Sequence, residues 1–342
     1  MKKLNRNYKN ILMKFFLVIM IFIIIISTSY NIAQNPPTQY HYTNDSFGWR
    51  YIPDYNSNDY NILLDQHSHS TFSDGILTVE QNILWHIAHG FNAMFLTDHG
   101  NVPKASLFNK LAEKYKEQII IMPGEEWTTG RIHLNLLGIK ISYKNAINQY
   151  PTNEEICKVI NFTHNQGGIV VVNHIPWSLA HLYDHPSRNQ LLSWGVDYIE
   201  LINGEDYDTT SESWCYNPGG FGKISGTDMH GPMNVSCWTL LKADNFSSVA
   251  IMEQIQLKNT EILFNPGISQ DQSIEFPARR YLLVKPLISI GTYFFNPNNE
   301  SKFNYRLFIV YFIGVLTIFT IIEVLIYFYP AISKKVKEKK NK

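Results

Sequence analysis

The chain has few cysteines, no net charge and no internal repeat. Its cysteines, Cys157, Cys215 and Cys237, are scattered without the spacing of a metal site, and they indicate no disulfide framework. A location outside the cytoplasm would allow one disulfide, and no pair is favoured. The 29 basic and 29 acidic side chains balance, which disfavours nucleic-acid binding, because binding to phosphates needs excess positive charge.

Apolar residues are concentrated in two runs of the sequence. Leu307–Tyr329 is long enough to span a bilayer, which takes roughly 20 residues, and the lysines after it argue against a buried core helix. Phe15–Ile26 is shorter and is typical of a signal peptide or a signal anchor. No convincing cleavage site follows Ile26, which favours an uncleaved anchor. Glu323, inside the second run, could bind a partner helix or face the membrane interface.

Lysine and arginine residues flank both runs on their outer sides. The positive-inside rule then predicts a membrane protein with two spans, both termini in the cytoplasm and the region between the spans outside it. The predicted organisation is a cytoplasmic N-terminus (1–10), a transmembrane helix or signal anchor (11–30), a linker (31–60), a folded domain (61–265), a loosely ordered membrane-proximal connection (266–304), a transmembrane helix (305–329) and a basic cytoplasmic tail (330–342).

Strand and helix patterns alternate after the linker. Capping boxes at Thr78–Gln81 and Thr152–Glu155 begin two predicted helices, and another helix is expected over Lys104–Glu117. The run Gly168–Val172 is rich in β-branched residues, as in a strand buried on both faces. Alternating βα units predict a parallel sheet, open or closed into a barrel. We expect the Trp177–Trp194 segment to be a loop or an insertion.

Six predicted strands carry histidines or carboxylates at one end. The strands are Asn61–Asp65, Phe91–Thr97, Ile119–Met122, Ile132–Ile139, Gly168–Val172 and Gly222–Ser225, and the polar groups are His67, His69, Asp98, His99, Glu125, Glu126, His133, His174, Asp228 and His230. Imidazole and carboxylate are ligand groups for zinc, manganese or iron. Such strands would build a metal site at one face of a barrel or sheet.

Two pairs of these residues have the spacing of joint ligands. His67 and His69 are two residues apart, as are Asp228 and His230. Positions i and i+2 share a face in an extended chain, so each pair can reach one ion. Asp74 lies between a serine and a glycine that permits a tight turn, so that its carboxylate can point back to the site.

Two other pairs are adjacent in sequence and require a choice. Glu125 and Glu126 point to opposite sides of an extended chain, so only one of them faces the site. Asp98 precedes His99, and we expect it to fix the tautomer of a ligand histidine rather than to bind metal itself.

Together these motifs resemble the PHP (polymerase and histidinol phosphatase) superfamily. The resemblance covers the region from Asn61 to Leu241. It is closest to the branch that includes the CehA/McbA-type metallohydrolases, through Gly124–Trp127 and Arg131–Gly138. The matching motifs are His67-x-His69, Ser73-Asp74-Gly75, Thr97-Asp98-His99, Gly124-Glu125-Glu126, His133, Asn173-His174 and Asp228-x-His230.

The resemblance implies an α/β fold, a distorted (β/α)7 TIM-like barrel of PHP type, here flanked by two transmembrane helices. It also implies two or three divalent metal ions, Zn, Mn or Fe, with a metal-bridging hydroxide as the nucleophile. The family's Gly-x-Glu spacing selects Glu126 as the shared ligand. Carried over, the first ion takes His67, His69, Glu126 and Asp228, the second takes Asp74, His99 and His230, and the third takes Glu126, His133 and His174.

Clustered divalent ions lower the pKa of a bound water and clamp the oxygens of an in-line displacement. The leading hypothesis is therefore a membrane-anchored phosphoesterase that acts on a small-molecule or lipid/envelope phosphate ester. Carboxylester or carbamate hydrolysis on the same site is the alternative among enzymes. A non-enzymatic, metal-stabilised binding or sensing domain outside the cytoplasm is the alternative of another class. Zero net charge disfavours an exonuclease.

Some polar residues beside the predicted strand ends could contact substrate. Arg131, Arg188 and Lys223 have the charge that a phosphate group would require. His181 and His185 follow His174 closely in sequence. Each of these residues is otherwise expected to be a solvated surface or capping group.

Overall fold

The structure is a computed structural model that describes residues 2–34, 51–100, 102, 105–143, 149–216, 218–267, 278–294 and 305–340. The chain divides into two compact units. One comprises residues 36–281 and 297–300, and the other comprises residues 1–35, 282–296 and 301–342. We call the first the α/β domain and the second the helical unit.

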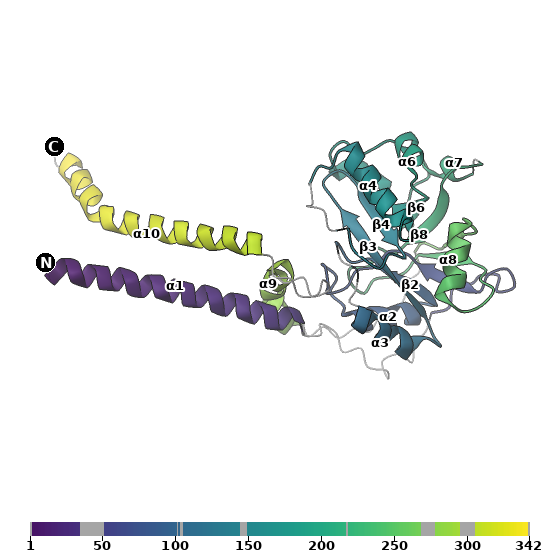
Figure 1. Cartoon of the computed structure of the whole chain (residues 1–342), viewed down its shortest axis with the longest axis horizontal. Coiled ribbons are helices and arrows are strands. Elements are labelled where there is room, and N and C mark those ends of the chain that lie inside the picture. Colours follow the sequence, from purple (N-terminus) through teal and green to yellow (C-terminus); the bar gives the residue numbers. More distant parts are fainter. Residues whose placement is uncertain are drawn as a thin grey trace. The chain divides into compact units, whose positions relative to one another are not determined.

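A mixed sheet organises the α/β domain (Figure 1). The described strands lie in the order β10-β9-β1-β2-β3-β4-β5-β6-β7, and β8 pairs with β6. The sheet curls into a half-barrel, and its closure into a (β/α)7 barrel stays a prediction. The strands are β1 Ile62–Asp65, β2 Ala93–Leu96, β3 Ile120–Thr128, β4 His133–Leu137, β5 Ile169–Val172, β6 Tyr198–Asn203, β7 Asp206–Tyr207, β8 Gly222–Gly226, β9 Cys237–Leu241 and β10 Glu261–Phe264.

The strand directions correct the prediction of a parallel sheet. β1, β2 and β3 are parallel neighbours, and β5, β6 and β8 are parallel to one another. β4 is antiparallel to both β3 and β5. It follows β3 after a short turn at residues 129–132 without a helix, and a tight turn can only reverse the chain. Antiparallel β9 joins β1 to β10.

Side-chain caps begin several helices between the strands. The capping boxes of Thr78 and Thr152 are confirmed at α2 and α4. The segment 177–194, predicted to be a loop or an insertion, contains most of α5 and all of α6, and Ser187 begins α6 through a capping box with Gln190. The helices of this domain are α2 Val79–Ala88, α3 Ala105–Tyr115, α4 Asn153–His164, α5 Ile175–His181, α6 Arg188–Trp194, α7 Glu212–Cys215 and α8 Ser248–Gln256.

Both faces of the central strands are buried. Leu64 of β1 and Phe95 of β2 pack in one hydrophobic cluster with Ile251 of α8. Leu63 and Met94, their neighbours in sequence, pack in another cluster on the opposite face. Because successive strand residues point to opposite faces, this division shows that β1 and β2 are buried on both sides.

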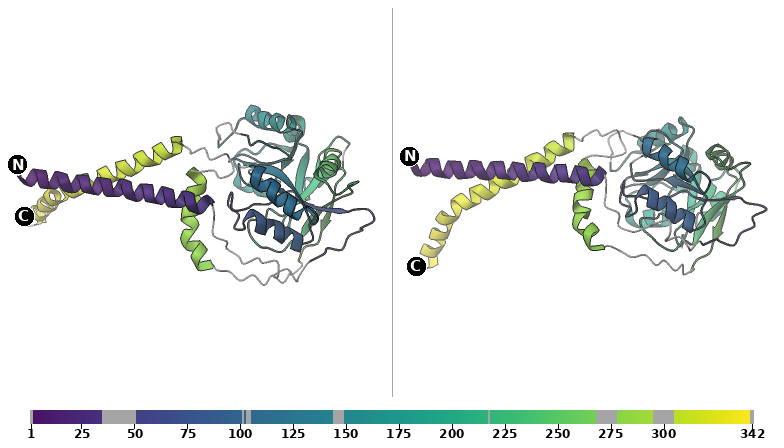
Figure 2. Two further views of the ribbon diagram at one scale, coloured as in Figure 1. Left: turned by 60° about the horizontal axis from the view of Figure 1, so that its bottom comes forward. Right: turned by 90° about the horizontal axis from the view of Figure 1, so that it is seen from below.

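Helices α2 and α3 lie side by side in the α/β domain (Figures 1 and 2). Ile83 of α2 and Leu111 of α3 belong to the same buried cluster as Leu63. The Glu80 carboxylate of α2 accepts hydrogen bonds from Lys114 Nζ at 2.5 Å and from Tyr115 Oη at 2.8 Å, both on α3. This packing supports the strands that lead to the site.

The helical unit contains α1 Lys2–Gln34, α10 Tyr305–Lys340 and most of α9 Ala278–Phe294. Segments Lys9–Ile32 and Phe308–Tyr329 are long and apolar enough to cross a membrane. Helix α9 lies where a loosely ordered connection was predicted, and it continues through Pro286. Its last residue, Phe294, packs on Tyr311 of α10 with ring centroids 5.4 Å apart, a contact that the sequence pattern did not indicate.

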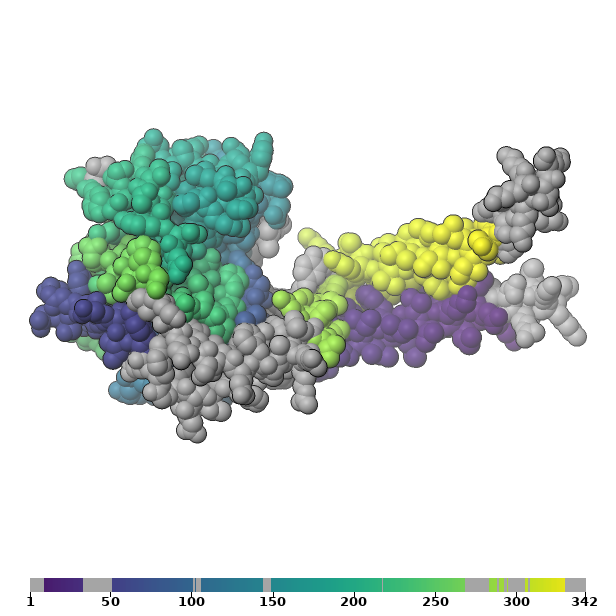
Figure 3. All heavy atoms as spheres, turned by 180° about the vertical axis from the view of Figure 1, so that it is seen from behind, coloured from purple at the N-terminus to yellow at the C-terminus, as the bar shows by residue number. Residues whose placement is uncertain are grey.

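Helices α1 and α10 lie against each other (Figure 3). The ring of Phe22 lies 5.5 Å from that of Phe308 and 5.8 Å from that of Phe312. Lys14 Nζ lies 2.6 Å from Glu323 Oε1. This ion pair gives Glu323 a partner within the chain.

Candidate metal centre

The predicted metal-binding residues meet at one edge of the sheet. The strands β1, β2, β3, β5 and β8 point in the same direction, so their carboxyl ends lie together at this edge. β4 runs the opposite way, which brings its first residue, His133, to the same edge. Glu126 lies within β3, opposite Asn135 of β4, and not beyond a strand that ends at Met122.

His67, His69, Glu126 and Asp228 form a group that we call the inner cluster. The Nε2 atoms of His67 and His69 lie 3.1 Å apart, and Asp228 Oδ1 lies 3.2 Å and 3.1 Å from them. Glu126 Oε2 lies 3.6 Å and 3.5 Å from the same two nitrogens. Both histidine side chains are fully buried, so the inner cluster lies deep in the domain.

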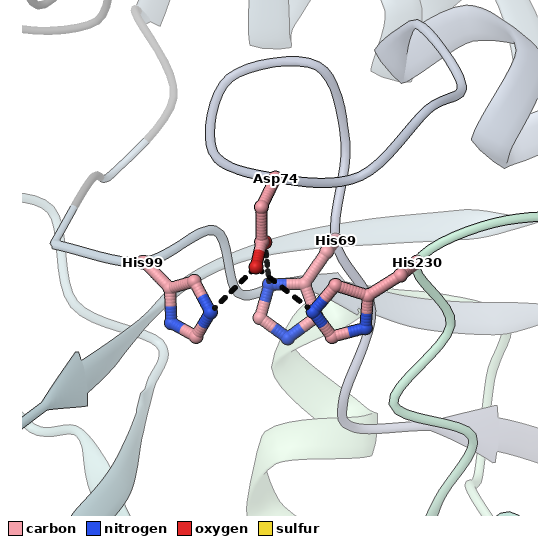
Figure 4. Close-up of side chains that lie close together, drawn as sticks. All are labelled: His69, Asp74, His99 and His230. Atoms are coloured by element: carbon pink, nitrogen blue, oxygen red, sulfur yellow. Dashed lines mark ion pairs between the residues drawn. The ribbon is translucent and has the colours of Figure 1, made fainter. Parts of the chain in front are cut away.

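Asp74, His99 and His230 form a second group, the outer cluster. The Asp74 carboxylate lies among three imidazoles (Figure 4). Its Oδ2 atom is 3.4 Å from His99 Nε2 and 3.3 Å from His230 Nε2, and its Oδ1 atom is 3.8 Å from His69 Nδ1. The side chains of Asp74 and His230 are 54% and 41% exposed. The outer cluster is therefore open to solvent, and His69 faces both clusters.

Glu126 connects these groups to the remaining predicted ligands. Its Oε1 atom lies 3.2 Å from His133 Nδ1 and 3.4 Å from His174 Nε2, and it accepts a hydrogen bond from Asn173 Nδ2 at 3.0 Å. Its Oε2 atom lies 2.8 Å from His99 Nδ1. One buried carboxylate thus contacts residues of both clusters and the pair His133 and His174.

Glu125 points away from this group, as adjacent residues of a strand must. It is buried, and burial raises the pKa of its carboxyl to about 7. The choice of Glu126 over Glu125 as the residue that faces the site therefore agrees with the strand geometry.

The charge distribution of the inner cluster calls for a cation. Burial lowers the pKa of His67, but the surrounding carboxylates, Asp228 first, raise it well above its ordinary value. Burial lowers the pKa of His69. Two imidazole nitrogens 3.1 Å apart cannot both carry a proton toward each other. A divalent ion in this position would satisfy both nitrogens and the carboxylates together.

The outer cluster has the same electrostatic character. Burial lowers the pKa of His99, but its hydrogen bonds with Asp74 and Glu126 together raise it to about 10. Burial raises the pKa of Asp74, but the hydrogen bonds from His230 and His99 outweigh it and lower that pKa below its usual range. The raised pKa values of His99 and His230 reflect the attraction of these carboxylates for positive charge.

The distances also fit metal ions. Atoms that share a zinc ion lie about 2.0–2.2 Å from it, so they lie within about 4.4 Å of one another. In each of three groups the ligand atoms lie within 4.8 Å of one another, which is close to that limit. The groups are His67, His69 and Asp228; His69, Asp74, His99 and His230; and His67, Glu126 and His174. His133 joins the last group through its contact with Glu126.

Asp98 has a different role from the predicted one. Its carboxylate accepts hydrogen bonds from the Ser70 backbone N–H at 2.7 Å, from Ser70 Oγ at 2.8 Å and from Ser73 Oγ at 2.8 Å. It thus fixes the loop that carries Asp74 and not a histidine tautomer.

The carboxylate that faces Nδ1 of His67, in the inner cluster, belongs to Glu200. Sequence reasoning missed this residue. Its one signal was a carboxylate between two apolar residues of a strand, Ile199 and Leu201.

A cavity of about 250 Å³ opens onto the site. Trp177 of α5 forms one wall, with its ring centroid 5.1 Å from that of His174 and 4.8 Å from that of His181. Trp177, Asn203 and Asp206 were not predicted from the sequence. The lining consists of Asp74, His99, Glu126, His133, His174, Trp177, Asn203, Asp206, Asp228 and His230.

The three cations considered for phosphate binding are paired elsewhere. Arg131 bonds to Asp184 and to the Pro151 carbonyl. Arg188 bonds to Asp208 and Ser211, and Lys223 pairs with Glu261. Within the described part of the chain, the cavity lining contains no lysine or arginine.

Other residues near the site also have local partners. His185 Nδ1 lies 2.9 Å from the Pro186 carbonyl oxygen, and burial lowers the pKa of its ring to about 4. His181 reaches the site only through its stacking on Trp177. The three cysteines are free.

Residues 65–187 match the model of the PHP domain. Together with the geometry of the clusters, this match supports a metal-dependent hydrolase. No curated protein matches the chain.

Two solved structures are similar to the chain. A two-domain protein from Bacteroides vulgatus that contains a predicted PHP-like metal-dependent phosphoesterase is 21% identical, with a TM-score of 0.49 over 64% of this chain and 68% of that one. An amidohydrolase from Chromobacterium violaceum with bound sulfate is 17% identical, with a TM-score of 0.40 over 59% of this chain and 97% of that one.

Proposed function

We propose that the chain is a metal-dependent phosphoesterase. The observation that supports this most is the position of Glu126, which contacts histidines from several strand ends beside an open cavity. Divalent ions held there would activate water and neutralise the oxygens of an ester in the transition state. The protein's own contribution is to hold these ions in fixed positions and to shape the cavity around the ester.

The proposed ligand sets follow the clusters. His67, His69, Glu126 and Asp228 hold a first ion, which is Zn, Mn or Fe. Asp74, His99 and His230 hold a second, and the other nitrogen of His69 lies beside it. Glu126, His133 and His174 hold a third. Because a catalytic metal site keeps an open position and a structural one is closed, the exposed outer cluster favours catalysis over a purely structural or sensing role.

Carboxylester or carbamate hydrolysis is the second candidate. It is favoured by the described cavity lining, which offers no lysine or arginine to a phosphate dianion, whereas a neutral carbonyl needs no such partner. This candidate would also agree with the CehA/McbA-type branch. A phosphodiester, with one negative charge, is a more suitable phosphate substrate for such a lining than a monoester dianion.

The test is a comparison of substrates with metal analysis of the same preparation. The purified full-length chain, loaded with Zn²⁺ or Mn²⁺, is assayed on p-nitrophenyl phosphate, bis-p-nitrophenyl phosphate and p-nitrophenyl acetate. Metal-dependent cleavage of either phosphate supports the proposal. Bound metal with cleavage of the acetate alone assigns the second candidate, and bound metal with no cleavage of any ester supports the binding domain.

The helical unit provides the membrane part of the proposal. Both termini lie in the cytoplasm, and the α/β domain lies on the other side, where a small-molecule or lipid/envelope phosphate ester would be its substrate. The Lys14–Glu323 ion pair supports an antiparallel pair of spans, because each charge alone is costly in lipid. Labelling of single cysteines in a cysteine-free background tests this. A cysteine replacing Asn58 should react with an impermeant reagent in intact cells, and one replacing Ser333 should not.

A further inference from the structure

Glu200 is a carboxylate of β6 with no exposed side-chain surface. Its Oε1 atom accepts a hydrogen bond from Gln66 Nε2 at 2.6 Å and lies 2.9 Å from His67 Nδ1. Its Oε2 atom accepts from the backbone N–H of His174 at 2.9 Å and from Asn203 Nδ2 at 3.0 Å. A buried carboxylate requires such compensation, and here two of the compensating groups belong to predicted metal ligands, His67 and His174.

All partners of Glu200 are nitrogen donors, and this fixes the proton on His67. Because an ionised carboxylate can only accept, His67 Nδ1 must carry a hydrogen toward Glu200. In a neutral imidazole the other nitrogen is then an acceptor. That nitrogen, Nε2, is the one that faces Asp228 and Glu126 in the inner cluster.

The same carboxylate supports two further parts of the site. Its bond to the His174 backbone holds a residue with φ of 28°, a positive value that side chains other than glycine rarely adopt. Asn203 Nδ2, which bonds to Glu200, also lies 3.3 Å from Asp228 Oδ2. Glu200 therefore contacts His67 directly, anchors His174 and reaches Asp228 through one amide.

We infer that Glu200 is a positioning residue, which keeps His67 in the tautomer whose Nε2 binds the inner ion. The inference rests on the proposed metal site. Hydrogen-bond partners of metal-binding histidines raise ligand basicity and fix ring orientation, and their loss costs about 10–100-fold in metal affinity. Glu200 binds no ion itself in this assignment.

Glu200→Gln tests the inference with almost no change in volume. Either orientation of the new amide places its NH2 group against two donors, which are Gln66 and His67 on one side or His174 and Asn203 on the other. If the NH2 group faces His67, the imidazole must move its proton to Nε2 and lose the ability to bind the ion there. Asp208→Asn is the matched control, because Asp208 is also buried and bonded to donors but lies with Arg188 and Ser211.

The measurement is Zn²⁺ binding to the ion-free, detergent-solubilised full-length chain, by calorimetry and by metal analysis, together with the Tm of each ion-free variant. We expect Glu200→Gln to weaken the inner ion about 10–100-fold, while Asp208→Asn binds as the wild type does. In a His67→Ala background, Glu200→Gln should cause a much smaller further loss. Inner-ion affinity within about twofold of wild type in Glu200→Gln would overturn the inference.

Two further results separate the inference from the proposed function. If the wild-type chain binds no ion, the proposed function is wrong. If the wild-type chain and Glu200→Gln bind ions equally well, only the inference is wrong. If Glu200→Gln does not fold, Glu200→Asp replaces it. The shorter carboxylate keeps the charge but moves away from His67, so weaker Zn²⁺ binding is expected, and binding equal to that of the wild type would overturn the inference.

Discussion

The inner and outer clusters contain similar ligand groups in very different surroundings. His67 and His69 of the inner cluster are fully buried, whereas Asp74 and His230 of the outer cluster are largely exposed. The inner side chains follow or lie within strands, and a buried carboxylate, Glu200, supports one of them from behind. If the proposed ions bind, we expect the inner cluster to retain its ion more tightly and the outer cluster to exchange its ion more readily.

The support of the outer cluster is local and loop-based. Asp74 lies in a turn where Gly75 comes so close to the chain that an added Cβ would lie 2.6 Å from the His69 carbonyl carbon. The turn is tied down by Ser70 and Ser73, which donate to Asp98. A loop that is held by a few hydrogen bonds is easier to displace than a strand in a sheet. The outer ion should therefore be the weaker of the two.

The largest effect is expected from Glu126→Gln, because this residue contacts both clusters. The amide removes a negative charge and one acceptor from the centre of the site, so we expect loss of more than one ion and a fall in kcat of about 10³-fold or more. Metal analysis and ester hydrolysis measure this. Glu125→Gln is the matched control, since Glu125 faces the other side of β3. Equal losses in the two variants would contradict the assignment of Glu126.

The comparison itself is tested by removing one histidine from each cluster. His67→Ala should strongly weaken inner-ion binding and lower the Tm, because it leaves Glu200 buried without one of its donors. His230→Ala should weaken only the outer ion and leave the Tm of the ion-free protein nearly unchanged, since the residue is exposed. Zn²⁺ titrations that separate a tight from a weak ion measure both. A tight ion lost in His230→Ala and kept in His67→Ala would reverse the comparison.

The two ions should also differ in their pH dependence. The pKa of His99 is raised to about 10 and that of His230 is raised as well, whereas in the inner cluster the pKa of His67 is raised and that of His69 is lowered. The stabilisation by protonated His99 is complete below its unfolded pKa near 6.5 and is lost as the pH rises through about 10. Below about pH 10, an ion that binds His99 must therefore displace the proton from its imidazole.

Outer-ion affinity should consequently rise more steeply with pH than inner-ion affinity, by about tenfold per pH unit for each displaced proton. Calorimetry at pH values from about 6.5 to about 8, on both sides of neutral pH, measures this dependence. Repeating it in buffers of different ionisation enthalpy counts the released protons. A steeper dependence for the inner ion would show that the buried histidines, and not the exposed ones, hold the protons in the ion-free protein.

The sequence predicted which side chains meet at the sheet edge better than it predicted the elements that carry them. The i, i+2 spacing of His67 and His69 is a local property of extended chain, so it could be recognised without the fold. The direction of β4 depends on how a short turn packs, and the pattern that placed His133 near a strand start did not reveal the antiparallel pairing. The continuation of β3 through Glu126 was missed because polar residues are usually read as the end of a strand.

The residues that support the site could not be predicted in the same way. Glu200 lies 133 residues from His67 in the sequence, and only the fold, in which β6 pairs with β5 and β8, places it beside that ring. Asp98 was expected to contact a histidine because His99 is its neighbour in sequence, whereas the fold places its carboxylate over Ser70 and Ser73. Helix α5, which carries Trp177, starts directly after His174 in a backbone conformation that sequence patterns do not indicate.

The smallest expected effect concerns the loop of the outer cluster. Ser73→Ala removes one hydrogen bond to Asp98, and a hydrogen bond contributes about 1 kcal/mol, or about fivefold in an equilibrium. We therefore expect outer-ion affinity to fall by about that factor, with inner-ion affinity unchanged, in a Zn²⁺ titration. Ser193→Ala, at an exposed serine of α6 whose hydroxyl bonds only within its own helix turn, is the control. A loss at the inner ion instead would mean that this loop supports both clusters, and the contrast between them would have to be abandoned.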